Sequence, residues 1–103
     1  MQSETNGADG LQTEATARTG DAVSMPRLLS LIKEQQFRCS LTGVELEPET
    51  ANADHIHSLM DGGENTIQNI QIVHQVVNRM KGTMSQDEFI AWCKRVAAHA
   101  MGM

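Results

Sequence analysis

Residues 53–82 read "ADHIHSLMDGGENTIQNIQIVHQVVNRMKG", and this stretch decides how the chain folds. An acid, Asp54, stands beside His55, a Gly-Gly pair follows, and Asn69 and Asn78 come 14 and 23 positions after the histidine. Polar residues of this kind are poor material for a hydrophobic core. They therefore either lie exposed on a loop or form a functional site.

The segments around these polar residues have recognisable periodicities. Residues 69–75, "NIQIVHQ", alternate polar and apolar side chains, which is typical of a short strand. Residues 74–82, "HQVVNRMKG", predict a helix that stops at Gly82. Upstream, residues 39–56 predict extended segments broken by turn residues. The pattern indicates a hairpin-like loop containing the Gly-Gly pair, then a passage from strand to helix.

A further helix is predicted on the N-terminal side of this region. Residues 26–38, "PRLLSLIKEQQFR", begin with a proline suited to a first helical turn. Their apolar residues recur at roughly helical spacing, which predicts a short amphipathic helix: Leu28, Leu29, Ile32 and Phe37.

Residues 85–100, "SQDEFIAWCKRVAAHA", predict the C-terminal helix. Ser85 and Glu88 have the spacing of a capping box. Four side chains share one face of this helix, and we expect that face to be core, with the cysteine as inert packing: Phe89, Trp92, Cys93 and Val96.

The chain has 103 residues, which allows one domain with a thin core. Residues 1–24 are rich in Gly, Ser, Thr, Ala and acids, so we expect a disordered leader there and a single domain over residues 25–103. The net charge is −5, of which the leader carries −3. The nearly balanced remainder neither supports nor excludes a phosphate ligand, because local placement matters more than total charge.

Cysteine usage and hydropathy point to the cytoplasm. Two cysteines are too few for a disulfide framework, and reduced thiols are the expectation. No apolar run approaches the roughly 18 residues that a membrane span needs. The N-terminus lacks the basic-then-apolar pattern of a signal peptide.

The polar residues suggest a specific chemistry. A carboxylate and an amide oxygen suit a hard divalent cation such as Mg²⁺, which prefers oxygen ligands and keeps several waters. An adjacent neutral histidine suits general-base work near neutral pH. A metal and a base together form the minimum apparatus for hydrolysing a phosphodiester.

The segment resembles the HNH endonucleases, whose site is a ββα-metal hairpin and helix. It contains, without a gap, the Asp-His-Ile, Gly-Gly, Asn-x-Gln, Asn-Arg and Lys-Gly landmarks of that family. The resemblance covers about residues 39–82, and residues 85–97 look like the trailing helix of small phage and bacterial members. It implies an α+β fold: a ββα-metal core flanked by an N-terminal and a C-terminal helix.

The resemblance also implies roles for individual residues. Asp54 and Asn78 would be metal ligands, and His55 would be the general base. Asn69 would brace the hairpin and hold the base in orientation. Candidate contacts to substrate phosphate follow from the site helix and its start: His74, Arg79 and Lys81.

The family also implies cofactors and partners. The metal would be Mg²⁺, with Mn²⁺ or another divalent ion as alternatives, and the substrate would be DNA, expected to be double-stranded, cut to leave a 5′-phosphate and a 3′-hydroxyl. Many relatives bind a structural zinc through two Cys-x-x-Cys pairs. Here Thr42 and Val77 each replace one cysteine of a pair, His74 replaces a third, and Cys39 is the cysteine that is left. We therefore expect that zinc to be lost.

Few basic residues are available for sequence recognition, so a homodimer or a protein partner would have to add specificity or a second cutting site. Two other functions stay open. One is a catalytically inactive HNH-fold module that binds nucleic acid or protein. The other is a zinc protein using Cys39, His55, His57 and His74, which are suitable residue types at an unfamiliar spacing.

Overall fold

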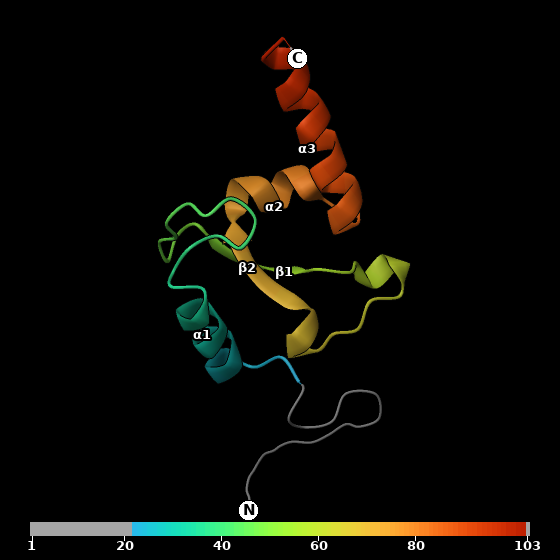
Figure 1. Ribbon diagram of the computed structural model, residues 1–103. Helices are drawn as coiled ribbons and strands as arrows, with labels where there is room; N and C mark the ends of the chain where they lie inside the picture. Colours follow the sequence, from blue (N-terminus) through green and yellow to red (C-terminus); the bar gives the residue numbers. More distant parts are fainter. Residues whose placement is uncertain (1–21, 103) are drawn as a thin grey trace, which may run out of the picture.

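The computed structural model describes residues 22–102 (Figure 1). The elements are α1 (Met25–Glu34), β1 (Ala51–His55), the 3-10 helices η2 (Leu59–Asp61) and η3 (Ile67–Asn69), β2 (Ile70–His74), α2 (Gln75–Lys81) and α3 (Gln86–Ala100). No helix among these residues is long and apolar enough to cross a membrane. The predicted leader falls mostly outside the described residues, and its boundary stays a prediction.

The centre of the fold is an antiparallel pair, β1 and β2, followed at once by α2. The register runs from Ala51 opposite His74 to His55 opposite Ile70. The loop between the strands holds both 3-10 helices. In Figure 1, α1 lies on one side of this hairpin, α2 lies on the other, and α3 extends away from both. The predicted α+β class with a ββα core is confirmed.

The hydrophobic core is small and is built around β2. Its buried members are Cys39, Leu46, Ile70, Ile72 and Val73. On α1, Leu28, Leu31 and Ile32 pack against this cluster. The side chain of Gln35, just after α1, accepts a hydrogen bond from the Ile72 backbone N–H and donates one to its carbonyl, each 2.9 Å long. The Gln35 side-chain amide therefore pairs with the β2 backbone as a neighbouring strand would, and it connects the end of α1 to β2.

The N-terminal helix is shorter than predicted. It ends at Glu34, and Gln36 and Phe37 then adopt left-handed backbone conformations with φ of 58° and 59°. Phe37 is consequently exposed instead of extending the apolar face, and Leu29 is exposed as well. The periodicity was correct for Leu28 and Ile32, because those two positions face β2.

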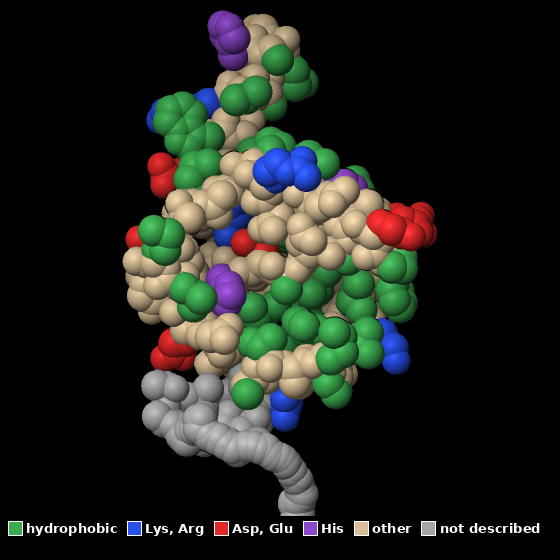
Figure 2. Space-filling view, turned by 180° about the vertical axis from the view of Figure 1, so that it is seen from behind, with side chains coloured by type: hydrophobic (Ala, Val, Ile, Leu, Met, Phe, Trp, Pro, Cys, Tyr) green, Lys and Arg blue, Asp and Glu red, His purple; other side chains and the backbone are tan. Residues whose placement is uncertain are grey.

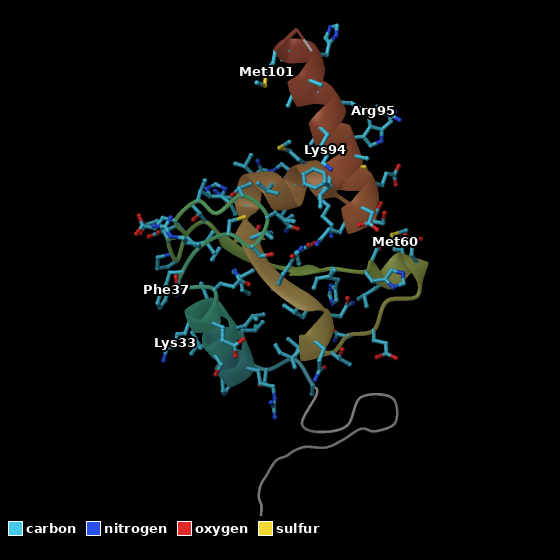
Figure 3. All side chains as sticks on the ribbon, viewed as in Figure 1. Lys33, Phe37, Met60, Lys94, Arg95 and Met101 are labelled. Carbon is cyan, nitrogen blue, oxygen red and sulfur yellow. The ribbon has the colours of Figure 1, made fainter. Side chains whose placement is uncertain are left out.

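The apolar face of α3 is not core, and the prediction that it would be is wrong. Phe89 is buried at 6% exposure, whereas Trp92 and Val96 are 50% and 67% exposed. Cys93 is half-buried. The physical reason is that α3 leaves the domain after its first turn, so residues further along have nothing to pack against; Lys94, Arg95 and Met101 lie on this projecting part (Figure 3).

This arrangement predicts unequal effects of alanine substitutions along α3. Phe89→Ala should lower the free energy of unfolding by about 3–5 kcal/mol, because it empties a packed position. Trp92→Ala should change it by less than about 1 kcal/mol, because half of that side chain is already in water. Urea unfolding followed by circular dichroism measures both. Equal losses would mean that α3 packs on the domain along its length.

Candidate functional site

A hollow of about 240 Å³ opens where β1, the inter-strand loop and α2 meet. Asp54 and His55 of β1 line it together with Asn78 of α2. The structure thus brings three of the sequence-predicted site residues together. Figure 2 shows basic and acidic side-chain atoms next to each other in a hollow of one face, with a histidine close by. The remaining lining comes from Ala53, Ser58, Leu59, Met60, Lys81 and Gly82.

Asp54 is buried, and one of its carboxylate oxygens is fully engaged. Oδ2 accepts a hydrogen bond from Lys81 Nζ at 2.8 Å and another from Gln71 Nε2 at 2.9 Å. Within residues 22–102, Oδ1 accepts no hydrogen bond. The carboxylate is therefore fixed in orientation through one oxygen, while the other stays available to a ligand.

Gln71 connects this carboxylate to distant parts of the chain. Its Oε1 accepts from Ser40 Oγ at 2.5 Å, and its Nε2 also donates to Gln86 Oε1 at 2.6 Å. Ser40 precedes β1 and Gln86 opens α3. A buried polar side chain needs such partners, and a satisfied network of this kind is rigid. Gln71 was not predicted as a site residue, because its alternation pattern indicated only a strand.

Lys81 differs from its predicted role. The sequence suggested a phosphate contact on the solvent side of a helix, but the side chain is 2% exposed. Its ammonium donates to Asp54 Oδ2 and, at 2.9 Å, to the backbone carbonyl of His55. Burial of a charge is tolerated when the charge is paired and hydrogen-bonded, and both conditions hold here. Lys81 therefore faces Asp54 inside the domain instead of facing a ligand outside it.

His55 stands at the last position of β1. In a regular strand Asp54 and His55 would point to opposite faces. Because the strand ends there, both reach the same hollow. The His55 Nε2 lies 2.8 Å from Asn65 Oδ1. The tautomer that carries its hydrogen on Nε2 would donate to this oxygen and keep its lone pair on Nδ1. Asn65 was missed in the sequence, since loop asparagines are common.

The Asn69 side chain braces the loop through hydrogen bonds. Its Oδ1 accepts from the His57 N–H at 2.9 Å, while its Nδ2 donates to the His57 carbonyl at 2.9 Å and to the Glu64 carbonyl at 2.8 Å. The Ile56 N–H also donates to the Asn69 carbonyl at 2.8 Å, which extends the β ladder by one rung. One side chain thus joins both ends of the loop next to His55.

Glycine is favoured at the two positions of the Gly-Gly pair for different reasons. Gly62 has φ of +90°, a region that side chains disfavour. Gly63 lies so close to the chain that a Cβ placed on it would be 2.0 Å from the His57 carbonyl oxygen. The loop can therefore close tightly beneath His57 only with glycine at position 63.

The donor set fits a divalent cation. Asn78 donates through Nδ2 to Asn52 Oδ1 over a long 3.4 Å contact, which leaves its side-chain oxygen without a hydrogen bond in the described part of the chain. Asp54 and Asn78 line the same hollow, and carboxylate and amide oxygens are the hard donors that such a cation prefers. Among residues 22–102, no group of three or more His, Cys, Asp or Glu side chains gathers around a metal position. Asp54 and Asn78 would therefore be the protein ligands.

Comparison with known families agrees with this geometry. Residues 37–83 match the family model described as HNH endonuclease. Residues 37–83 belong to the HNH endonuclease family. The matched residues include β1, β2 and α2, and with them every side chain placed so far in the hollow. Comparison with curated proteins returned no match. The HNH family is a family of nucleases, so the domain is of a nuclease type.

Two predicted substrate contacts lie elsewhere on the HNH domain. His74 ends β2 at the opposite end of the hairpin from His55. Its Nδ1 accepts from the Val76 N–H at 3.1 Å and so caps α2, which is a structural role. Arg79 is exposed on α2 and remains a candidate for phosphate contact.

The Cys39 sulfur accepts hydrogen bonds from neighbouring parts of the chain. Burial raises the pKa of the Cys39 thiol, but hydrogen bonds to the sulfur from the Thr42 side chain and from the backbone N–H groups of His74, Leu41 and Thr42 outweigh burial and lower that pKa. The loss of the zinc stays a prediction. The alternative zinc site is not formed, since the register holds His55 and His74 at opposite ends of the hairpin.

Asn69→Ala tests the brace. Removal leaves backbone groups of the loop without partners, so we expect a loss of about 1–3 kcal/mol in the free energy of unfolding. Gln75→Ala is a suitable control, because that side chain makes no hydrogen bond within the described residues. Chemical denaturation compares the two variants. An Asn69 variant as stable as the control would mean that the loop holds its shape without the amide.

Proposed function

We propose that this chain is a metal-dependent endonuclease that hydrolyses phosphodiester bonds of DNA. The observation that carries the proposal is the meeting of Asp54, His55 and Asn78 in one hollow, with the His55 ring held by a hydrogen bond. The HNH family supports a DNA substrate and the use of a divalent ion. A carboxylate, an amide oxygen and an imidazole with a free lone pair together suit phosphodiester hydrolysis.

His55 is the proposed general base. Asn65 holds the hydrogen on Nε2, so Nδ1 is the nitrogen that can take a proton from water. The water oxygen then attacks phosphorus, its proton passes to Nδ1, and the bond from phosphorus to the 3′ oxygen breaks. The departing 3′ oxygen takes a proton from solvent water. The products are a 5′-phosphate and a 3′-hydroxyl. Asn69 contributes by fixing the backbone of His57, two residues from the base.

Asp54 and Asn78 are the proposed ligands of the ion, and Mg²⁺ is the proposed ion because both donors are hard oxygens. When bound, such an ion offsets the charge that develops at the phosphorus and on the departing oxygen. With two protein donors, the site leaves room for water and for a phosphate oxygen of the substrate. Gln71 and Lys81 keep the Asp54 carboxylate aimed into the hollow.

Recognition of DNA by this domain would be weak, or it would be directed by the structure of the DNA and not by its sequence. Beyond the leader the net charge is −2, and the exposed Arg79 is one of few cations near α2. Specific protein–DNA interfaces usually bury about 1,000 Å² or more of protein and are strongly basic. We propose double-stranded DNA as the substrate, with a protein partner or a second copy supplying what one domain lacks. Cutting both strands would then use two sites or successive nicks.

A non-catalytic DNA-binding module is the second candidate. It is favoured by the Lys81–Asp54 ion pair, which places a cation on the carboxylate that the metal would use. A pure binding module, however, has no need for an imidazole whose Nδ1 lone pair is kept free. Cleavage assays separate the two candidates.

The direct test is cleavage of supercoiled plasmid with Mg²⁺, Mn²⁺ or EDTA. We expect metal-dependent nicking or linearisation that His55→Ala reduces by at least about 100-fold, since a general base contributes about 10²–10⁴-fold. His99→Ala is the matched control, because His99 is exposed near the end of α3 and should have no effect. Equal cleavage by both variants and the parent protein would remove His55 from the mechanism. DNA binding without cleavage would favour the second candidate.

Asn78→Ala tests the ligand assignment separately. Loss of one of two protein donors should raise the metal concentration needed for half-maximal cleavage by about tenfold or more, in the range seen when metal-site partners are removed. Cleavage measured across a series of Mg²⁺ and Mn²⁺ concentrations gives this value. An unchanged metal requirement with a lower rate would instead place Asn78 on the substrate.

A further inference from the structure

The Lys81 ammonium is a buried charge for which the proposed hydrolysis has no direct use. It lies 2.8 Å from Asp54 Oδ2 and 2.9 Å from the His55 carbonyl, at the base of the hollow. It therefore touches both residues on which the chemistry would depend. A charge this deeply buried is stable only because those two oxygens compensate it.

The charges that line the hollow cancel. Asp54 and Lys81 are the two formally charged side chains among its lining residues, and they carry opposite signs. A divalent cation entering here would meet a carboxylate whose charge is already balanced. The ion would also lie close to a fixed ammonium, because both would contact the same carboxylate, Lys81 through Oδ2 and the ion through Oδ1. Like charges at such separations repel strongly in a partly buried site.

We propose that Lys81 is a positioning residue that acts as a built-in counter-cation for Asp54. It holds the carboxylate in the orientation a metal needs, and it keeps the affinity of the free domain for that metal low. A bound DNA phosphate supplies the missing negative charge, so the metal and DNA each strengthen the binding of the other, as linkage requires. The proposal deepens the proposed function and rests on its metal ligands, Asp54 and Asn78.

Two features of the geometry support this role over a purely structural one. The ammonium bonds the oxygen that Gln71 also holds, and so leaves Oδ1 without a hydrogen bond among the described residues. A lysine that served the fold alone could pair with either oxygen. The pair also keeps the ligand in place without a metal, so a domain free of DNA can hold its site ready.

The test measures metal affinity without DNA. Lys81→Met keeps an unbranched apolar chain as long as the lysine's four-carbon stem and removes the charged group at its end. Mn²⁺ binding is followed by electron paramagnetic resonance. We expect the variant to bind Mn²⁺ about tenfold or more tightly than the parent protein. Lys94→Met is the matched control, because it removes the same charge from an exposed position on α3 and should leave the affinity unchanged (Figure 3). Unchanged or weaker binding by a folded Lys81 variant would overturn the proposal.

Loss of the ion pair could prevent Lys81→Met from folding, so a second variant and a second measurement are needed. Lys81→Gln keeps an uncharged hydrogen-bond donor on a side chain one atom shorter, and the same increase in affinity is expected. The coupling to DNA is measured with Lys81 intact, in the His55→Ala protein, which binds without turnover. Mn²⁺ should bind that protein about tenfold more tightly when a DNA duplex is present. Equal affinity with and without the duplex would overturn the proposal.

These results also distinguish this proposal from the proposed function. Tighter Mn²⁺ binding by the Lys81 variants, in a protein that never cleaves DNA, would support the counter-cation and reject the nuclease. Cleavage by the parent protein, with metal affinity independent of Lys81, would support the nuclease and reject the counter-cation.

Discussion

The antiparallel register that sets Asp54 opposite Gln71 decides which side chains the hairpin buries. Successive residues of a strand face opposite sides, so a shift of one position would exchange the two faces. In this register the Asp54 carboxylate and the Gln71 amide meet and hydrogen-bond inside the domain. The same pairing brings β1 to its end at His55, where the imidazole can turn toward the hollow. The Asn69 brace lies next to that end and holds the register in place.

Apolar packing and polar hydrogen bonds both hold the elements together. The core cluster around β2 accounts for the attachment of α1, through Leu28, Leu31 and Ile32. Polar contacts from Lys81 to Asp54 and from Gln86 to Gln71 also hold α2 and the first turn of α3, where Phe89 is buried as well. Polar contacts are more demanding in geometry than apolar ones, and a satisfied network specifies one arrangement. On the side of the domain that carries the hollow, the arrangement of the elements is therefore specified by the directions of hydrogen bonds as well as by packing.

Periodicity and turn residues predicted the hairpin and the helices. The meeting of Asp54, His55 and Asn78 was implied by the resemblance to the HNH endonucleases, because regular alternation along a strand would set Asp54 and His55 on opposite faces. Lys81 could not be placed in this way. A lysine on a helix is usually solvated, and its burial depends on a carboxylate 27 residues earlier in the chain. The exposed face of α3 was mispredicted for a related reason. Periodicity identifies residues that share a face, but it carries no information on whether another element covers that face.

The inter-strand loop has two parts that differ in how much change they can accept. Its base cannot vary, because Gly63 lies against the His57 carbonyl and Asn69 bonds the same residue. Its tip carries Leu59 and Met60, which line the hollow and yet are largely in water, with Met60 80% exposed (Figure 3). Substitutions at the tip would alter the rim of the hollow while leaving the base, and the residues it orients, untouched. The loop thus joins a base that admits only glycine at position 63 to a tip whose side chains can be exchanged.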